Sequence, residues 1–358
     1  MKITRLRHKI DQIDSKIVSL LGERAEVVSM IGQEKAKANM DLHVPQREEE
    51  IFTRLMRQNT GRFPTHAIRP VFREIISACR SLEGPLKLAY LGPEGTFTHL
   101  ACTRRFGVSA HFVPVHSIGD VFAEVEKRNV EYGVVPIENS SEGVVSHTLD
   151  MFMESDLKIC GEILLEVSHS LLSKSGDLRK VKKIYSHPHA FAQSRKWLEA
   201  NLPRVPFFEA SSTAAAAKLA AKEPTAAAIA SELAASLYNL KVISRTIEDT
   251  PRNFTRFLII GQTPTIPTHR DKTSLMFSIK DRVGALYRIL EPFAKHQINL
   301  TKVESRPSKT KAWEYIFYLD IEGHLADEPV KAAIALLQEE CLFLKVLGSY
   351  PRGNSIEV

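Results

Sequence analysis

The sequence predicts a multidomain protein in which an all-helical segment is followed by an α/β domain and then by a ferredoxin-like βαββαβ domain. The chain of 358 residues is too long for one core, since ~100–200 residues per domain is usual. Near residue 86 the apolar pattern changes from helical spacing to short strands, and a polar stretch with two prolines follows at 263–268. We therefore expect domains at 1–83, 86–262 and 272–350.

The first segment has the spacing of helices. Apolar residues between Leu6 and Ile31 recur at steps of three and four, and no proline interrupts the chain from Leu6 to Ala38. Pro45 suits the first turn of a second helix, which should run to about residue 59. A third helix is expected over 65–82, before Glu83-Gly84-Pro85 breaks the pattern.

The middle segment alternates short apolar strands with helical stretches, which predicts an α/β domain with a largely parallel sheet. The expected strands include 86–91, 133–137, 183–186, 226–230 and 256–260. Ligands of such sheets bind beyond the carboxyl ends of the strands.

The last segment fits a ferredoxin-like order of elements in under 90 residues. The expected elements are strand 273–279, helix 283–296, strand 299–305, strand 312–321, helix 326–339 and strand 342–349.

Composition and charge exclude several classes of protein. Hydrophobic residues make up 44% of the chain and charged residues 25%, near the average for folded soluble chains, which excludes disordered and fibrous proteins. The net charge of +6 is not gathered into a basic run or tail. We therefore expect no nucleic-acid partner and favour small anionic ligands.

Targeting and redox features favour a cytoplasmic location. No apolar run approaches the ~20 residues of a membrane helix, so no membrane association is expected. The segment Met1–His8 has no apolar signal core. The four cysteines are scattered without a CxxC pair, which argues against a zinc site or a disulfide framework.

Three basic residues of the first helix suggest an anion site. Arg24 and Lys35 are eleven residues apart and share a helix face. Arg7 precedes Arg24 by 17 residues, which is about 25 Å along a helix, so one small ligand cannot touch both. Arg7 would then serve a site completed by another subunit, most simply in an antiparallel dimer. Spacing alone favours the alternative of a solvated charged helix.

The helical segment resembles the all-helical chorismate mutase family at Leu6-Arg7, Ile10-Asp11, Glu23-Arg24, Lys35 and Pro45-Gln46-Arg47-Glu48. The resemblance implies an interlocked helical dimer and a site for chorismate. Its residues would be Arg7, Arg24, Lys35, Arg47 and Glu48, with Lys35 and Glu48 catalytic. The reaction, an isomerisation to prephenate, needs a clamp on two carboxylates and a donor to the ether oxygen. Arginines can provide the clamp and Lys35 the donor.

Two positions depart from a well-known form of that family. Cys79 and Glu83 stand where a serine and a glutamine contact the substrate. A glutamate can donate a hydrogen bond to the ether oxygen only when it is protonated. We therefore hypothesise that mutase activity falls as rising pH removes the Glu83 proton.

The middle segment resembles the prephenate dehydratase family, whose fold is two α/β lobes flanking a cleft as in periplasmic binding proteins. The similar stretches are GPEGTFTH (92–99), VVPIENSSEGVV (134–145), SHPHAFAQ (186–193), SSTAAAA (211–217) and NFTRF (253–257). The loop at 92–95 lacks a Gly-Lys-Ser/Thr sequence, so nucleotide binding is not expected.

The resemblance implies that prephenate loses its ring hydroxyl and CO2 to give phenylpyruvate, a carbon–oxygen lyase reaction. The site residues would be Glu138, Asn139, Ser140, Ser186, Gln193, Ser212, Thr213, Thr255 and Arg256. We assign carboxylate binding to Arg256 and to the N–H groups before the alanine-rich helix, although Ser212 or Thr213 equally suits a simple N-cap. The proton donor stays open between Thr255, the family's usual assignment, and Glu138.

The last segment resembles the ACT regulatory domain, in which phenylalanine binds between paired subunits. The motifs are Gly284-Ala285-Leu286 and Glu304-Ser305-Arg306-Pro307, and Asn299 and Leu300 join the second. The resemblance implies feedback inhibition by L-phenylalanine, which must bind one conformation better than another. A close-packing glycine and a strand terminator are the alternative interpretation.

Together the three segments resemble the bifunctional chorismate mutase–prephenate dehydratase family of phenylalanine biosynthesis. Neither reaction needs a metal or cofactor, and the expected assembly is a homodimer or a dimer of dimers. Two other hypotheses stay open. One is a monofunctional dehydratase whose helical segment is a dimerisation arm, and the other is a non-catalytic amino-acid sensor.

Overall fold

The computed structural model describes the chain except residues 1, 39–44, 281, 308–314, 354 and 357–358, and it leaves out the side chains of 45, 355 and 356. Residues 312–314 of one expected strand thus lie outside the described part. The chain forms two compact units, each described by itself below. Unit 1 contains residues 1–87 and 103–111, and unit 2 contains 88–102 and 112–358. Residues 103–111 lie in the expected dehydratase segment of the sequence but belong to the helical unit in the structure.

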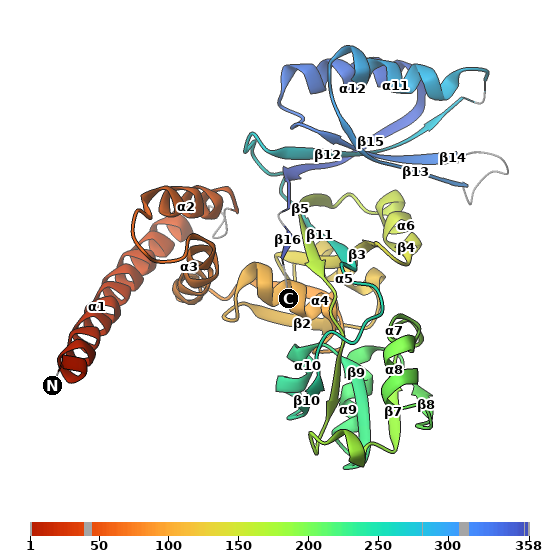
Figure 1. The fold of residues 1–358 in the computed structure, drawn as a ribbon. Helices are drawn as coiled ribbons and strands as arrows, with labels where there is room; N and C mark the ends of the chain where they lie inside the picture. The colour runs from red at the N-terminus through yellow and green to blue at the C-terminus, as the bar shows by residue number, and fades with distance from the viewer. Residues whose placement is uncertain (1, 39–44, 281, 308–314, 354, 357–358) are drawn as a thin grey trace. The chain divides into compact units, whose positions relative to one another are not determined.

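Unit 1 is built on one long helix and two shorter ones, as the sequence predicts. The helices are α1 (Lys2–Lys37), α2 (Pro45–Gln58) and α3 (Thr65–Arg80). At ~1.5 Å per residue, the 36 residues of α1 span about 54 Å, and the helix extends well beyond α2 and α3 (Figure 1). Phe52, Ile68 and Ile76 are buried where α2 and α3 pack. In α1, which the structure describes throughout, only Gly32 is buried.

The first lobe of unit 2 holds a seven-stranded sheet in the order β16-β5-β11-β3-β1-β2, with β4 paired to β3. Its strands and helices are β1 (Lys87–Leu91), α4 (Phe97–Phe106), β2 (His111–Val115), α5 (Ile118–Glu126), β3 (Tyr132–Asn139), β4 (Gly143–Val144), α6 (Ser146–Glu154), β5 (Lys158–Glu166), β11 (Phe254–Gly261) and β16 (Ser355–Ile356).

The second lobe holds a five-stranded sheet in the order β10-β6-β9-β7-β8. Its elements are β6 (Ser170–Ser173), η1 (Leu178–Lys180), β7 (Lys183–Ser186), α7 (Pro188–Gln193), α8 (Arg195–Asn201), β8 (Phe207–Glu209), α9 (Thr213–Ala220), β9 (Ala226–Ala230), α10 (Glu232–Leu237) and β10 (Lys241–Ser244). Short alanine side chains on α9 and β9 are fully buried against each other, which lets helix and sheet approach closely.

The expectation of a largely parallel sheet is wrong, because both lobes mix parallel and antiparallel pairs. β1 pairs with β3 in parallel, as β7 does with β8 and β9, but β11 is antiparallel to both β3 and β5, and β6 is antiparallel to both β9 and β10. The chain leaves the first lobe after β5 and returns from the second lobe as β11. Because no crossover helix of the first lobe links β11 to β3, nothing forces the parallel direction.

The C-terminal domain has the predicted βαββαβ order, with the sheet order β13-β14-β12-β15. Its elements are β12 (Asp271–Ile279), α11 (Ala285–Lys295), β13 (Leu300–Pro307), β14 (Tyr315–Glu322), α12 (Glu328–Glu340) and β15 (Cys341–Pro351). Both helices cover one face of this sheet. The other face contributes Met276, Tyr318, Leu347 and Tyr350 to the apolar core of the first lobe, so the two domains share a core.

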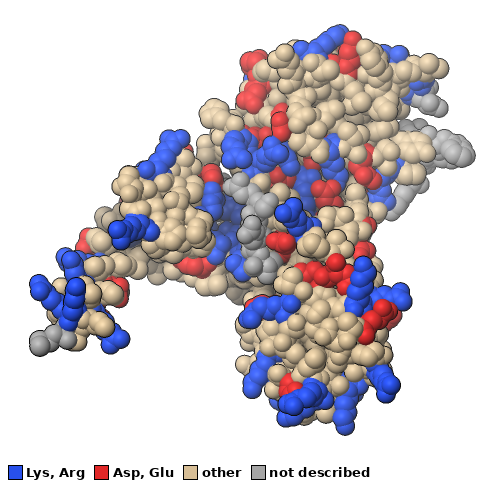
Figure 2. All heavy atoms as spheres, in the orientation of Figure 1, with Lys and Arg blue, Asp and Glu red and all other residues tan. Residues whose placement is uncertain are grey.

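Charges of both signs are interspersed over the face shown in Figure 2. Among the described residues, no helix combines the length and apolar character needed to cross a membrane. Within the same residues, no cluster of three or more His, Cys, Asp or Glu could hold a metal ion.

We predict that Gly348→Ala destabilises unit 2. A Cβ atom at Gly348 would lie 2.3 Å from the Ile159 carbonyl oxygen, so β15 would have to move away from β5. Overpacking of this kind costs roughly 1–3 kcal/mol, measured as the free energy of unfolding in urea. Gly119→Ala is the control, because its nearest neighbour would lie at 3.7 Å. Equal stability of the two variants would contradict the prediction.

Candidate functional site

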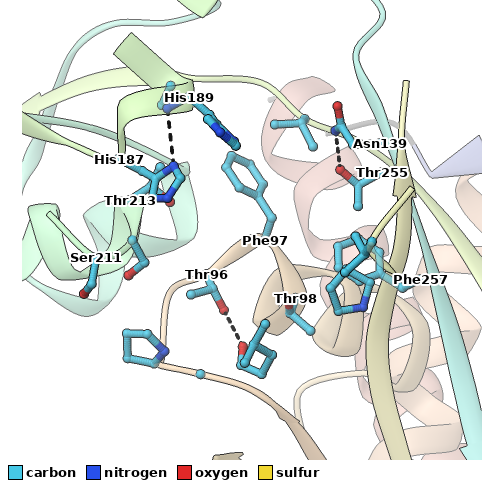
Figure 3. Close-up of a pocket in the computed structure, with 18 of the residues that line it drawn as sticks. Thr96, Phe97, Thr98, Asn139, His187, His189, Ser211, Thr213, Thr255 and Phe257 are labelled. Atoms are coloured by element: carbon cyan, nitrogen blue, oxygen red, sulfur yellow. Dashed lines mark hydrogen bonds between the residues drawn. The ribbon is translucent and has the colours of Figure 1, made fainter. Parts of the chain in front are cut away.

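A cleft of about 1100 Å3 lies between the two lobes of unit 2. Loops at the carboxyl ends of β1, β3 and β7 line it, as the sequence predicts, together with the start of α9 and of β11. Figure 3 shows Phe97 projecting into the cleft between His189 of one lobe and the pair Asn139 and Thr255 of the other. Of the expected substrate residues, the cleft is lined by Asn139, Gln193, Ser212, Thr213 and Thr255.

Asn139 and Thr255 form the central polar pair of the cleft. The two residues face each other across β3 and β11, and Asn139 Nδ2 donates to Thr255 Oγ1 at 2.7 Å (Figure 3). The Asn139 Oδ1 atom accepts from the backbone N–H groups of Ser141 and Glu142 at 2.9 and 3.1 Å, which fixes the orientation of the amide. Because Thr255 Oγ1 accepts from Asn139, its own proton is free to be donated to a ligand.

The start of α9 forms another wall of the cleft. Ser212 is the N-cap of this helix, and its Oγ accepts from Ala215 N at 3.0 Å. Thr213 begins the helix and also lines the cleft, as does Lys218 further along it. A helix N-terminus and an ammonium group both favour an anion. The N-cap role and the ligand role of Ser212 are therefore compatible.

Gln193 joins the two lobes through its side-chain amide. Its Nε2 donates to Ser141 Oγ at 3.1 Å and to Glu142 Oε1 at 3.2 Å, while its Oε1 accepts from Asn253 Nδ2 at 3.3 Å. The Oε1 also lies 2.9 Å from His169 Nε2, so this nitrogen must carry the proton of the neutral ring.

His169 is a cleft residue that sequence reasoning missed. It lies between β5 and β6, where the chain crosses from one lobe to the other, and is 3% exposed. Burial lowers the pKa of His169, so its ring is neutral at pH 7. A single histidine after a strand has no sequence signature of its own.

Arg256 does not line the cleft, contrary to expectation. Side chains alternate along β11, so Thr255 and Phe257 face the cleft while Arg256 faces the C-terminal βαββαβ domain. Its Nε donates to Glu162 at 2.7 Å, one Nη to Asp320 at 2.7 Å and the other Nη to the Tyr350 hydroxyl at 2.9 Å. A guanidinium held in this way cannot reach a substrate carboxylate in the cleft.

Three other expected residues also lie away from the cleft lining. Glu138 is paired with Lys302 and with Arg256, so we withdraw it as the proton donor. Ser186 is fully buried and donates to the carbonyl of Ile229 at 2.9 Å, which holds β7 to β9. Ser140 Oγ accepts from the backbone N–H of Phe254 at 2.9 Å and positions the start of β11.

In unit 1 the structure brings Lys35 and Glu83 together. Lys35 Nζ lies 3.7 Å from Glu83 Oε2, and the carboxyl group is nearly buried. A Cβ atom at Gly32 would lie 2.8 Å from Glu83 Cγ, so the glycine makes room for this side chain. Glu83 therefore lies beside Lys35, the donor that the resemblance implies.

The other expected mutase residues differ in their partners and in their burial. Glu48 accepts from Arg80 at 2.8 Å and lies 3.6 Å from Arg105, two arginines that sequence reasoning missed. Arg47 is exposed and pairs with Glu50 at 2.9 Å. The remaining three differ in burial: Cys79 is buried, Arg24 has one buried Nη atom, and Arg7 is exposed.

The expected effector residues lie around the start of α11 and along β13. Gly284 has φ +74° and is the N-cap of α11, a conformation that favours glycine. Ala285 and Leu286 follow it in the first turn, and Leu286 is exposed. Arg306 Nη1 donates to the Ser146 carbonyl at 2.6 Å and contacts Asp150 at 3.2 Å, both on α6 of the first lobe. Asn299, Leu300, Glu304 and Ser305 are exposed or partly exposed.

Three family models match consecutive parts of the chain. They are Chorismate mutase type II at residues 6–84, Prephenate dehydratase at 88–265 and ACT domain at 273–335. A bifunctional chorismate mutase/prephenate dehydratase of Aquifex aeolicus (strain VF5) is 53% identical over 356 residues, which is 98% of each chain. The chain belongs to the bifunctional chorismate mutase/prephenate dehydratase family.

Further relatives agree with this family. The bifunctional chorismate mutase/prephenate dehydratase of Pseudomonas aeruginosa is 42% identical over 98% of each chain. Among solved structures, a prephenate dehydratase from Arthrobacter aurescens in complex with L-Phe has a TM-score of 0.69 at 34% identity, covering 74% of this chain and 90% of that one. Bifunctional relatives matched over the full length weigh against a monofunctional dehydratase and against a non-catalytic sensor.

We predict that His169 makes stability depend on acid pH. The folded state keeps the ring neutral, whereas the unfolded chain binds a proton below about pH 6.5. Below that pH the unfolded state holds more protons than the folded state. The free energy of unfolding therefore decreases as the pH is lowered, by at most about 1.4 kcal/mol per pH unit for one proton. His169→Gln keeps a donor for Gln193 but cannot titrate. Urea titrations between pH 7.5 and 5 should show the smaller decline in this variant, and parallel curves would disprove the role.

Proposed function

We propose that this chain carries both activities of its family, with the mutase in unit 1 and the dehydratase in the cleft of unit 2. Chorismate is rearranged to prephenate, and prephenate loses water and CO2 to give phenylpyruvate. The observation that carries the dehydratase assignment is the Asn139–Thr255 pair, which directs a hydroxyl donor into a cleft of suitable size. The reactions take place in the cytoplasm in this proposal, and the four cysteines, all free thiols, fit a reducing compartment.

In the dehydratase reaction, the bond between the ring and one carboxylate breaks and its electron pair enters the ring. The C–O bond to the ring hydroxyl breaks as the ring becomes aromatic, and the departing hydroxyl takes up one proton from the solvent and leaves as water. Thr255 accepts from Asn139 and therefore can donate to the departing oxygen. A threonine hydroxyl is a weak acid, so its role is to orient and polarise this group through a hydrogen bond.

The two carboxylates of prephenate need cationic or N–H partners in the cleft. Arg256 is occupied elsewhere, so we assign one carboxylate to the start of α9 at Ser212 and Thr213, with Lys218 nearby on the same helix. A helix N-terminus offers N–H groups that point along its axis toward an anion. Gln193 holds the neighbouring loop in place through Ser141 and Glu142.

In unit 1, Lys35 and Glu83 are the proposed donors to the ether oxygen of chorismate. Lys35 lies near the end of α1 and Glu83 just after the end of α3, and their charged groups are 3.7 Å apart. Charge that develops on the ether oxygen is stabilised by the Lys35 ammonium, and Glu83 adds a hydrogen bond only when its carboxyl group carries a proton. Glu48, held by Arg80, and Arg24 and Arg47 are the proposed polar contacts to the rest of the substrate, beside Cys79.

The exposed apolar stripe of α1 supports a homodimer, alone or as part of a dimer of dimers. Its residues follow the alternating three- and four-residue steps of a coiled coil: Ile3, Leu6, Ile10, Ile13, Ile17, Leu20, Val27 and Ile31. Arg24 occupies the missing step between Leu20 and Val27. An antiparallel pair centred between Ser15 and Lys16 places Arg7 of one chain opposite Arg24 of the other, so each mutase site takes an arginine from the second copy.

L-Phenylalanine is the proposed effector of the ACT domain. The supporting observations are the left-handed Gly284 at the start of α11 and the exposed Leu286 beside it. The related dehydratase from Arthrobacter aurescens is described in complex with L-Phe. Binding at this position inhibits the enzyme if one conformation of the paired chains binds phenylalanine better than the other.

We predict that single substitutions separate the two activities. The purified chain given chorismate alone should form phenylpyruvate. Thr255→Val should lower dehydratase kcat about 10²-fold or more, so that prephenate accumulates. Lys35→Ala should lower mutase kcat by a similar factor, while the dehydratase of this variant still consumes added prephenate. The products are followed by chromatography over time. A Lys35→Ala variant with normal mutase turnover would reduce the helical unit to a structural role.

We predict that mutase activity declines as pH rises and that Glu83 causes the decline. Glu83 donates to the ether oxygen only when protonated, whereas a glutamine keeps its N–H donor at every pH. Mutase kcat is measured from pH 5 to 9 for the wild type and for Glu83→Gln, and the variant should have the flatter profile. A flat wild-type profile would rule out this role of Glu83.

A further inference from the structure

We propose that the ACT domain positions the dehydratase active site through a buried charge network centred on Arg256, with Lys302 and Asp320 as positioning residues for the reaction. The inference rests on the proposed dehydratase function of the cleft. Neither Lys302 nor Asp320 lines that cleft, so both would act through Arg256 and Glu138 on the pair Asn139 and Thr255.

The network is largely buried, with Glu138 its most exposed member at 34%, and its charges balance only when both domains are present. The dehydratase domain contributes Arg256, Glu138 and Glu162, with a net charge of −1, and the ACT domain contributes Lys272, Lys302 and Asp320, with a net charge of +1. Within the network, three ion pairs join the two domains: Arg256–Asp320 at 2.7 Å, Lys272–Glu162 at 3.0 Å and Lys302–Glu138. Charges in a buried site need partners, so each domain completes the other.

Neutral groups of the ACT domain complete the hydrogen bonds of the network. The Tyr350 hydroxyl accepts from Arg256 at 2.9 Å, and burial raises the pKa of Tyr350, which keeps it a neutral hydroxyl. Ser274 Oγ donates to Asp320 at 2.5 Å and lies 2.7 Å from the Tyr350 hydroxyl. On the dehydratase side, Arg256 also donates to Glu162 and to Glu138. Together with Asp320 and Tyr350, these partners hold its guanidinium in one orientation.

The network reaches the active site through the backbone of two strands. Across β3 and β11, Asn139 faces Thr255, and the next pair, Glu138 and Arg256, faces each other directly beside it. Successive side chains point to opposite faces, so the first pair faces the cleft and the second faces the ACT domain. The register shifts directly after Arg256, which marks an irregularity where a strand bends more easily. Arg256 and Glu138, fixed on one face, therefore fix Thr255 and Asn139 on the other.

The test compares two lysines of the same interface. Lys302→Gln and Asp320→Asn should each lower the kcat for prephenate about 10-fold and leave KM within about twofold, because contacts to the substrate stay intact. Lys345 is the control: it also links the ACT domain to the dehydratase domain, donating to the carbonyls of Phe152 at 3.1 Å and Ser155 at 2.8 Å, but it is outside the network. Lys345→Gln should keep the wild-type kcat at a comparable melting temperature.

Rescue separates positioning from general damage. Lys302→Arg keeps the positive charge and should restore most of kcat. The double variant Glu138→Gln/Lys302→Gln should lose less kcat than the product of the fold-losses of the two single variants. Normal kcat in folded Lys302→Gln and Asp320→Asn, or an equal loss in Lys345→Gln, would overturn the inference. A wild-type chain that does not consume prephenate would instead refute the proposed function.

Discussion

The antiparallel pairing of β3 with β11 is the interaction on which the cleft and the ACT interface both depend. Its register sets Asn139 opposite Thr255 and Glu138 opposite Arg256. Since side chains alternate, one register serves two surfaces at once, and a slip by one residue would turn Arg256 toward the substrate and Thr255 toward the ACT domain. Hydrogen bonds from both lobes also hold the start of β11. Asn253, the residue before this strand, bonds to Ser140 of the first lobe and to Gln193 of the second.

The ACT domain is a structural part of the dehydratase as well as its expected regulator. Its sheet buries Met276, Tyr318 and Leu347 in the core of the first lobe, and its charges neutralise the carboxylates of that lobe. Lys302 lies on β13, the strand that also carries the expected effector residues Glu304 to Arg306. A ligand that moves this strand would therefore move Lys302 and, through Glu138, the active-site pair, which gives effector binding a contiguous physical route to the cleft.

The sequence predicts the elements of this fold better than the directions of its side chains. Periodicity alone places α2, α3 and the βαββαβ order within a few residues, because local spacing determines which face is buried. The antiparallel direction of β11 depends on the path of the chain between lobes, which no local pattern encodes. Alternation shows that Thr255 and Arg256 point to opposite faces, but only the tertiary structure shows which face is the cleft. His169 and Arg80 were missed because single polar residues carry no pattern.

The long helix α1 exposes most of its surface in a single chain. With only Gly32 buried among its 36 residues, it has little tertiary packing along most of its length, and the apolar stripe from Ile3 to Ile31 faces solvent in a single chain. Helices of this kind are stabilised mainly by what they pack against. Arg7 lies about 25 Å from Arg24 along the same helix, so no single chain can bring both to one chorismate. Burial of the stripe against a second copy would supply the missing arginine, so dimer formation and completion of the mutase site would be the same event.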